Sequence, residues 1–323
     1  MFRYCISSRT WLFLCVLSVL ALGALGPASR AQGTVAARFD QAAVSKDIGA
    51  LLKEHGEGVV ANLWVGGDSG KAWFELNADQ PSATASAIKT FYLVELFASH
   101  RGRLDTPLPG AGAVLENDQH PAISHFSSEQ RTEIRRGLGA ASVRRVGEVM
   151  MGKATASNAV YNAAANLTTA VLGGPELLTK LIRDRDPAFA RVSVRRYMLR
   201  DRKNPGDNEA PAVALAALYQ RLAVRALTGI DSETMRAIRE AMIKEDIDSV
   251  GTRFSKSGSL SSDPLTEVRA GWWETTRGPV IYVVMLRQSS AGPTAAPSSS
   301  QQLAKTADTL TDKLAGAGLA AMK

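Results

Sequence analysis

One apolar segment constrains the fold of this 323-residue chain more than any other feature. Residues 85–100 carry large apolar side chains on every side of a helix, among them Ile88, Phe91, Leu93 and Phe97. A surface helix has an apolar stripe on one side only, whereas a helix that is apolar all round is enclosed by other elements. The segment is therefore predicted to be a buried helix, and the rest of the chain must supply the layers that cover it.

The first 31 residues have the three parts of a secretory signal peptide. Arg3 and Arg9 precede an apolar run over residues 11–25, and the segment ends in small residues at a cleavage site. We expect residues 1–31 to be removed on export, which leaves residues 32–323 as one folded domain in the periplasm or outside the cell. A retained anchor is the alternative, but the apolar run is shorter than the about 20 residues that a membrane-spanning helix needs.

Both cysteines, Cys5 and Cys15, lie within this predicted leader. The mature chain therefore has none, which excludes disulfides, thiol nucleophiles and thiolate metal sites. Its 292 residues are enough to bury a sizeable apolar core without such cross-links. The leader also holds three arginines and no acidic residue, so that 35 basic and 31 acidic side chains remain and the mature net charge is +4.

Strand signals at both ends of the mature chain enclose a long helical stretch. Residues 58–65 and 71–76 alternate in polarity around a glycine-rich turn and predict a β-hairpin. We predict an α+β fold in which the N- and C-terminal segments form one antiparallel sheet, packed against a mostly helical region. Helices are predicted at residues 39–53, 127–138, 142–151, 158–172, 175–183, 211–227 and 232–243, with a last one ending at residue 322; the C-terminal strands at 252–256, 267–273 and 280–286; and a surface loop at 184–210.

The buried helix begins with two polar residues that suit acyl-transfer chemistry. Ser86 and Lys89 are three residues apart, so their side chains lie on one side of a helix. A serine hydroxyl needs a base to take its proton, and a lysine whose pKa is lowered by burial can be that base without a histidine. The explanation without function is a serine near a helix N-terminus and a lysine that reaches solvent. A lysine in so apolar a helix is costly, which favours a functional role.

Another motif, Lys256-Ser257-Gly258, follows a short strand-like run further along the chain. A strand here would present a cation and a hydroxyl along one edge, and the glycine would let a substrate approach the backbone. A lysine beside a turn explains the same residues without any function. The presence of Ser86 and Lys89 in the same chain makes coincidence a poor explanation.

Together these motifs resemble S-x-x-K and K-T-G, two of the three motifs of the class A β-lactamases and penicillin-binding proteins. The chain is similar to class A β-lactamases over nearly all of its mature length, including residues 74–79, 164–175 and 277–280. The resemblance implies the fold of that family, a small-molecule substrate with a strained or activated amide or ester bond, and a monomer.

The resemblance also implies roles for single residues. Ser86 would be the acylated nucleophile and Lys89 its proton acceptor. The Lys256-Ser257-Gly258 motif would bind the substrate, with Lys256 and Ser257 at its carboxylate. The backbone N–H groups of Ser86 and Ser259 would form the oxyanion hole.

The second of the three family motifs in chain order, S-D-N, lies between the other two and is incomplete in this chain. Counting from the upstream helix gives Ser157 as the relay of a proton to the leaving nitrogen and Asn158 as the residue that holds the substrate amide. Counting back from Asn166 gives Tyr161 and Asn162 instead, where a phenol would be the relay. We prefer the first pair and keep the second as the alternative. Capping or bridging of helices by these residues is the explanation without function.

Two further family residues are missing from their places. Class A enzymes carry a glutamate, within Arg-Trp-Glu-Pro, that activates the deacylating water, but the similar string Arg196-Tyr197-Met198-Leu199 has a methionine there. Asp201 or Glu209 are the nearby substitutes, and slow deacylation is expected. The family also has an arginine after its third motif, K-T-G, which is not in its usual place in this chain. Arg269 stands at a neighbouring position. Residues 183–203 hold eight basic and three acidic side chains, which would attract anionic substrates if they border the site.

No metal, cofactor or nucleic-acid signal accompanies these motifs. The four histidines are scattered, and phosphate-loop and dinucleotide signatures are absent. We expect an exported serine hydrolase, acylated at Ser86, that hydrolyses the amide bond of β-lactams and needs no cofactor or metal. Two alternatives stay open. One is a penicillin-binding, DD-peptidase- or esterase-like relative that acylates but deacylates slowly, and the other is a catalytically silent binding module of the same fold.

Overall fold

The structure, a computed structural model, describes residues 38–54, 58–247, 250–288 and 299–322. The predicted signal peptide, residues 1–31, lies outside these ranges. Within them, no helix combines the length and the apolar content that a membrane span requires.

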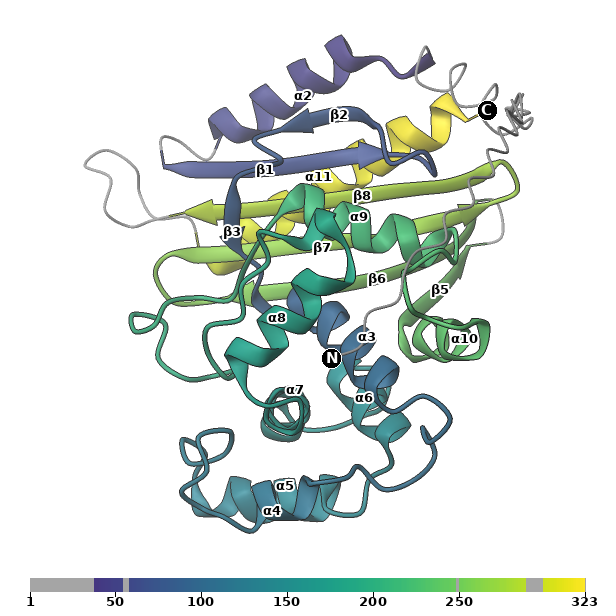
Figure 1. Ribbon diagram of the computed structural model, residues 1–323. Coiled ribbons are helices and arrows are strands. Elements are labelled where there is room, and N and C mark those ends of the chain that lie inside the picture. The colour runs from purple at the N-terminus through teal and green to yellow at the C-terminus, as the bar shows by residue number, and fades with distance from the viewer. Residues whose placement is uncertain (1–37, 55–57, 248–249, 289–298, 323) are drawn as a thin grey trace, which may run out of the picture.

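A six-stranded antiparallel sheet joins the two ends of the chain (Figure 1). Its strands, in spatial order, are β2 (Ala72–Leu76), β1 (Val59–Gly66), β8 (Gly278–Gln288), β7 (Leu265–Thr275), β6 (Gly251–Leu260) and β5 (Ile243–Ile247). The N-terminal hairpin meets the C-terminal strands where β1 pairs with β8, with Val59 opposite Gln288 and Gly66 opposite Ile281. The predicted α+β fold, with one antiparallel sheet made from both ends of the chain, is confirmed.

Strand β5 is one of the elements that the sequence pattern does not predict, with β3 (Pro81–Ala83), β4 (Glu209–Pro211) and the short helix α4 (Ala111–Leu115). The helix expected over residues 232–243 ends at Ala241, and the chain continues as an edge strand paired with β6. The first four side chains of β5 are exposed and three of the five are charged. Such a strand has no alternation of apolar and polar residues, so it is held by backbone pairing and leaves no periodic signal.

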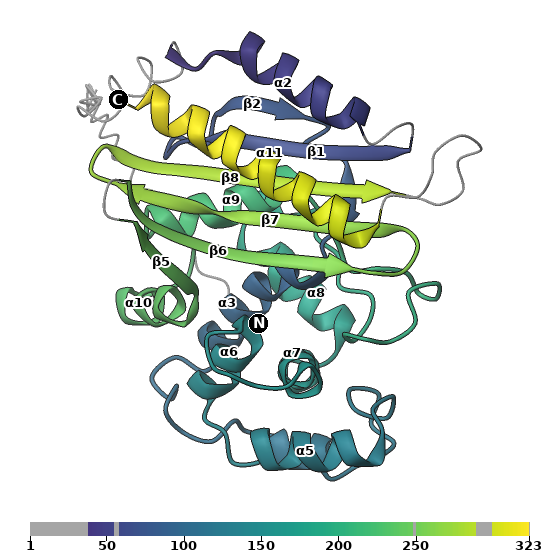
Figure 2. The same ribbon diagram turned by 180° about the vertical axis from the view of Figure 1, so that it is seen from behind.

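Helices cover both sides of the sheet (Figures 1 and 2). On one side, α2 (Gln41–Glu54) and α11 (Ser300–Ala321) lie together and bury one apolar cluster against β1 and β8. On the other side, α9 (Ala212–Ala223) and the remaining helices bury a second, larger cluster. The sheet is therefore the middle layer of the molecule, and each end of the chain adds a helix to its outer side.

The remaining helices are arranged around the predicted buried helix. A short 3-10 turn, η1 (Ala85–Ile88), leads into α3 (Lys89–Ser99), and every residue from Lys89 to Phe97 is buried. This confirms the prediction of an enclosed helix. The surrounding elements are α4 (Ala111–Leu115), α5 (Ser128–Leu138), α6 (Val143–Met151), α7 (Asn158–Val171), α8 (Pro175–Arg185), η2 (Pro187–Phe189) and α10 (Ser232–Ala241), with a two-stranded sheet of β3 (Pro81–Ala83) and β4 (Glu209–Pro211).

The segment over residues 184–210 is a surface segment, as its composition predicts, with exposed residues such as Leu199 and Arg200, but part of it is buried. Val192 and Met198 are buried, and two asparagine side chains hold the backbone in place. The Oδ1 atom of Asn208 accepts two backbone N–H groups at 2.8 and 3.0 Å, and the amide of Asn166 bonds to both the N–H and the carbonyl of Met198. These side-chain hydrogen bonds replace those of regular secondary structure, so the chain can be buried without forming a helix or strand.

A buried ion pair connects this segment to the central helix. Arg185, at the end of α8, bonds to both carboxylate oxygens of Glu95 in α3 at 2.5 and 2.7 Å, and the Glu95 side chain is only 2% exposed. We predict that Glu95→Ala lowers the free energy of unfolding by about 3–5 kcal/mol, because it leaves the Arg185 guanidinium without its counter-charge. Urea denaturation monitored by circular dichroism measures this change.

The matched control is Asp105→Ala. Asp105 accepts two bonds from Arg144 at 2.6 and 3.0 Å, in the same two-pronged geometry, but its side chain is 76% exposed. Water replaces such a partner readily, so the denaturation midpoint of this variant should stay near that of the wild type. Equal losses in the two variants would contradict the role assigned to burial.

Candidate active site

Ser86 lies in the turn that leads from β3 into the buried helix. It is the second residue of η1, and its side chain is partly exposed at the wall of a cleft. Just before it, the buried Thr84 donates both its N–H and its hydroxyl to the carbonyl of Asn208, each at 3.0 Å. Ala85 adopts a φ of 48°, a left-handed conformation that turns the chain sharply. These contacts hold the serine at the cleft, while the helix behind it is enclosed.

Strand β6 passes close beside this turn, and the approach requires the glycine at position 258. A Cβ atom there would lie 2.6 Å from the backbone N of Ser86 and 2.8 Å from the carbonyl O of Thr84. Strand β5 pairs with β6 only over residues 251–255, and beyond that point the same edge of β6 lies beside η1. A strand edge beside the serine offers backbone N–H and C=O groups to an extended substrate.

The Lys89 amine is completely buried one turn after Ser86. Its Nζ donates a hydrogen bond to Oδ1 of Asn162 at 2.9 Å and lies 3.3 Å from the centre of the Tyr161 ring. Lys256 comes from β6 to the same ring, with its Nζ 5.3 Å from the ring centre. The phenol ring of Tyr161 is thus in contact with two amines that the sequence separates by more than 160 residues.

The protonation of Lys89 is set by this enclosure. Burial, and then the positive charge of Lys256, hold the pKa of Lys89 well below its ordinary value of 10.5. The face of the Tyr161 ring favours the ammonium form, but the ring carries no net charge to offset the desolvation. Among the described residues, no carboxylate contacts the amine. Lys89 is therefore suited to be a neutral amine, the form that accepts a proton.

For the second motif, S-D-N, the preferred register, Ser157 with Asn158, is corrected to the alternative, Tyr161 with Asn162. Ser157 is not part of the cleft lining; its hydroxyl caps α7 by accepting the backbone N–H of Val160 at 3.3 Å. Tyr161 and Asn162, about one turn further along, are the residues that contact the Lys89 amine. The preferred register fails because an N-cap side chain bonds to its own helix backbone.

Asn158 lies in the cleft lining, but its hydrogen bonds support a neighbour. Its carbonyl and its side-chain oxygen each accept a bond from Nδ2 of Asn162 at 2.9 Å. This arrangement directs Oδ1 of Asn162 to Lys89. The structure therefore puts Asn162, and not Asn158, next to the amine. Counting back from Asn166 was the sequence signal that identified this register.

The residues of the third motif point to different sides of the sheet. Lys256 is buried and approaches Tyr161, whereas Ser257 is exposed and lines a separate pocket on the α11 side. Ser259 lines the Ser86 cleft, and its hydroxyl donates to Oε2 of Glu267 at 2.7 Å. The structure thus brings Gly258 to the Ser86 turn, Ser259 to the cleft and Lys256 to Tyr161, and it leaves the Ser257 side chain outside the cleft.

The displaced arginine is already bound by carboxylates. Arg269 donates to Glu267 at 2.8 Å and to Asp308 of α11 at 2.6 Å, and it is not part of the Ser86 cleft lining. Its position opposite Ser257 in the β6–β7 ladder places it on the α11 side. Recognition of an anionic group in the cleft must therefore come from other residues.

The cleft that Ser86 borders has a volume of about 730 Å³ and a charged wall. The segment over residues 184–210 supplies that wall, and the carboxylate of Asp207 accepts bonds from Arg196 and Arg202 at 2.8 and 2.9 Å. Burial acts to raise the pKa of Asp207, but the two arginines outweigh it and the pKa is lowered. Arg200 and Lys203 are exposed in the same wall and have no carboxylate partner within the described ranges. The wall therefore carries cations that a substrate can reach.

None of the described carboxylates occupies the place of the family glutamate. Met198, at that place in the sequence, is buried. Glu209 pairs with Arg195 at 2.9 Å and lies outside the cleft lining. Asp201 is in the lining, but it is exposed and accepts the backbone N–H of Lys203 at 2.9 Å. Neither of the two substitutes considered from the sequence is directed to Ser86 by its observed bonds.

In the part of the chain that the structure describes, no three His, Cys, Asp or Glu side chains are grouped to hold a metal ion.

Solved structures share this architecture over most of the chain. A β-lactamase from Sphaerobacter thermophilus has a TM-score of 0.58 at 15% sequence identity, covering 85% of this chain and 98% of its own. A β-lactamase from Desulfarculus baarsii has a TM-score of 0.58 at 19% identity, with coverages of 87% and 97%. A class A β-lactamase from Mycobacterium abscessus has a TM-score of 0.54 at 18% identity, with coverages of 82% and 96%.

No family model matches the sequence, and no curated protein sequence matches it either. The structural likeness alone establishes the class: the chain has the fold of the class A β-lactamases, as its motifs predicted.

We predict that Gly258→Ala displaces the Ser86 turn and lowers the rate of acylation at Ser86 by about 100-fold, since small misplacements of reacting groups have effects of that size. The cause is the overlap of the new methyl group with Ser86 N and Thr84 O. The matched control is Gly112→Ala in α4, where a Cβ meets no atom within 4 Å. Acylation by p-nitrophenyl acetate, followed by intact-mass spectrometry, measures both; an unchanged rate in Gly258→Ala would contradict the tight approach.

Proposed function

We propose that this protein is a serine hydrolase of the β-lactamase type, in which Ser86 is acylated by the amide bond of a β-lactam or a related strained amide or ester. The observation that carries the proposal is the buried Lys89 amine, which follows Ser86 by one turn and has a lowered pKa. A neutral amine at this position supplies the base that a serine nucleophile needs, and the fold supports the same class of reaction.

Acylation would proceed in two proton transfers. The neutral Lys89 amine accepts the Ser86 hydroxyl proton while Oγ forms a bond to the substrate carbonyl carbon. The backbone N–H groups of Ser86 and Ser259 donate to the developing oxyanion. The C–N bond of the substrate then breaks, and the leaving nitrogen takes a proton that originates on Lys89. Tyr161 is the candidate relay for this proton, because it is a phenol that lines the cleft with Ser86 and lies next to both lysine amines.

We infer that the substrate is a small anionic molecule. Lys256 is 4% exposed behind the Tyr161 ring, and it contributes a positive field at the inner end of the cleft. Arg200 and Lys203 contribute further positive charge at the outer wall. A carboxylate-bearing lactam matches this distribution, and Asn162 supplies an amide beside the amine for the substrate's own amide group.

The second candidate function is acylation with slow hydrolysis, as in a penicillin-binding or esterase-like relative. The specific observation in its favour is the arrangement of carboxylates. Asp207 is bound by two arginines, Glu209 lies outside the cleft lining, and Met198 stands where the family has its glutamate. With Met198 in place of the family glutamate, the attacking water lacks the carboxylate that activates it in class A enzymes, and the acyl-enzyme would persist.

The decisive experiment is the time course of the intact mass with one penicillin and one cephalosporin. We predict one adduct on the wild-type protein and none on Ser86→Ala, since Ser86 lines the cleft one turn before the buried Lys89 amine. An adduct that disappears as product accumulates means a working β-lactamase, and one that persists means the second candidate. Thermal stabilisation by a penicillin without any adduct would instead indicate a silent binding module and would overturn the proposal.

The matched control is Ser157→Ala. This serine caps α7 and is not part of the cleft lining, so the variant should still form the adduct at close to the wild-type rate. Tyr161→Phe keeps the ring between the amines but removes the hydroxyl, and it should slow adduct formation by roughly 100-fold or more, the range of a lost general acid–base group. Slow acylation in Ser157→Ala together with fast acylation in Tyr161→Phe would restore Ser157 as the relay.

The pH dependence of acylation tests the role of Lys89. The rate should rise with pH as the amine loses its proton and become constant well below pH 10.5, because burial and Lys256 lower the pKa of Lys89. Lys256→Met removes a positive charge, which raises the pKa of Lys89 and moves the inflection to higher pH. An uncharged ester, p-nitrophenyl acetate, keeps the measurement independent of carboxylate binding.

The control for the pH profile is Lys203→Met, which changes an exposed residue of the outer wall. The inflection of its profile should match that of the wild type. No shift of the inflection in Lys256→Met would contradict the role assigned to Lys89.

We also propose that the mature protein is located in the periplasm or outside the cell. The support is the signal-peptide composition of residues 1–31. Cell fractionation followed by N-terminal sequencing of the product tests both the location and the cleavage site.

A further inference from the structure

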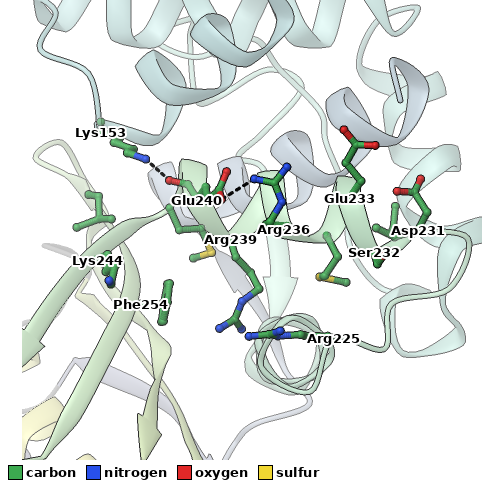
Figure 3. A pocket seen from close by; sticks show the side chains of 15 residues that line it. Lys153, Arg225, Asp231, Ser232, Glu233, Arg236, Arg239, Glu240, Lys244 and Phe254 are labelled. Carbon is green, nitrogen blue, oxygen red and sulfur yellow. Dashed lines mark hydrogen bonds and ion pairs between the residues drawn. The ribbon is translucent and has the colours of Figure 1, made fainter. Parts of the chain in front are cut away.

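A second cleft, with a volume of about 1070 Å³, lies beside α10 (Figure 3). It is formed by one side of α10, the start of β5, the end of α6 and the connection between α9 and α10. None of its lining residues belongs to the lining of the Ser86 cleft. The proposed hydrolase chemistry makes no use of it.

The inner wall of this cleft is apolar and rigid. Met235, Met242 and Phe254 line it, and all three are at least 94% buried. The Phe254 ring is stacked on Trp272, with ring centres 4.5 Å apart and an angle of 6° between the planes. Thioether and aromatic side chains adapt well to flat or chain-like apolar groups. This wall therefore suits the apolar part of a small ligand.

One end of the cleft carries two arginines that share a single carboxylate. Arg239 bonds to Glu274 at 2.5 Å, and Arg225 reaches the other oxygen of the same carboxylate only at 4.0 Å. Figure 3 shows the side chains of both arginines converging at this end, beside Phe254. Two guanidinium groups and one carboxylate leave an excess positive charge. The side chain of Arg225 is 66% exposed, so its donors are open to a ligand.

The backbone of Arg225 is strained to hold this position. Its φ is 57°, a left-handed conformation at the end of α9 that favours glycine.

The acidic side chains of the lining do not neutralise this end. Asp231 caps α10 and accepts bonds from the N–H and the hydroxyl of Thr234 at 2.8 and 2.9 Å. Glu240 pairs with Arg236 at 2.8 Å. Glu233, the second residue of α10, is exposed in the lining and has no ion-pair partner among the described residues. All three carboxylates lie along α10, away from Arg225 in Figure 3.

We propose that this cleft binds a small amphipathic monoanion, with its alkyl or aromatic body against Met235, Met242 and Phe254 and its carboxylate, or an equivalent oxyanion, at Arg225. The apolar wall, the shared Glu274 and the exposed guanidinium each select one part of such a molecule. The site is separate from the Ser86 cleft and does not depend on the proposed acylation.

The test uses 1-anilinonaphthalene-8-sulfonate, a fluorescent probe with a flat apolar body and one sulfonate, titrated into the full mature chain. We expect one saturable site on the wild type. Arg225→Gly removes the guanidinium and relieves the positive φ, so it should fold at least as stably as the wild type while its probe affinity falls by about tenfold, about 1.4 kcal/mol, or more. Circular dichroism and thermal melting verify the fold.

A second variant blocks the cleft sterically. Ser232 is exposed in the lining at the first position of α10, and Ser232→Trp should lower the probe affinity by a similar factor. The matched control is Ser128→Trp, at the first and exposed position of α5. Lys46→Ala, an exposed residue of α2, controls for the loss of one positive charge. Both controls should bind the probe as the wild type does.

Competition then tests the anionic group. Octanoate should displace the probe at a concentration at least about tenfold lower than 1-octanol, which has the same chain without the charge. Equal displacement by the two compounds, or wild-type probe binding by both Arg225→Gly and Ser232→Trp, would overturn the proposal. Since the readout is binding, a failure here is distinguishable from a failure of acylation at Ser86.

Discussion

The burial of one amine is the constraint on which the rest of the candidate active site depends. An ammonium ion without a counter-charge is strongly disfavoured in an apolar interior, so Lys89 in α3 has a lowered pKa. Helix α7 brings Asn162 and Tyr161 to the amine, and β6 adds the positive charge of Lys256. A group that water would keep charged thereby becomes a base, and the enclosed helix that the sequence predicts is what excludes the water.

The serine is held by a second set of contacts, which comes from the segment expected to be a solvent-exposed loop. The carbonyl of Asn208 accepts both bonds from Thr84, and the Asn208 side chain holds the backbone of its own segment. On the opposite side, Gly258 permits β6 to approach Ser86. The charged segment over residues 184–210 is thus a support of the site as well as one wall of its cleft. Its arginines can be buried because they pair with carboxylates such as Asp207.

Local signals predicted most of the elements. The N-cap residues Ser127, Ser142 and Ser157 each accept a backbone N–H of the helix that follows, and the hairpin around the glycine-rich turn pairs as expected. The edge strand β5 was not predicted, because its side chains are exposed and carry no periodic pattern. The burial of part of the segment over residues 184–210, such as Val192 and Met198, was not predicted either, because it rests on side-chain bonds of Asn166 and Asn208.

By itself, the sequence determined the fold class, the enclosed helix and the two lysine motifs, because apolar periodicity, caps and short spacings act between neighbours in the chain. Only the tertiary structure decided the register of the second motif. Ser157 and Tyr161 are both plausible relays in sequence, and packing of α7 against α3 brings Tyr161 to Lys89 while Ser157 caps its own helix. The same is true of the pairing of Arg225 with Glu274. Contacts between distant segments depend on how whole elements pack, and no local spacing encodes them.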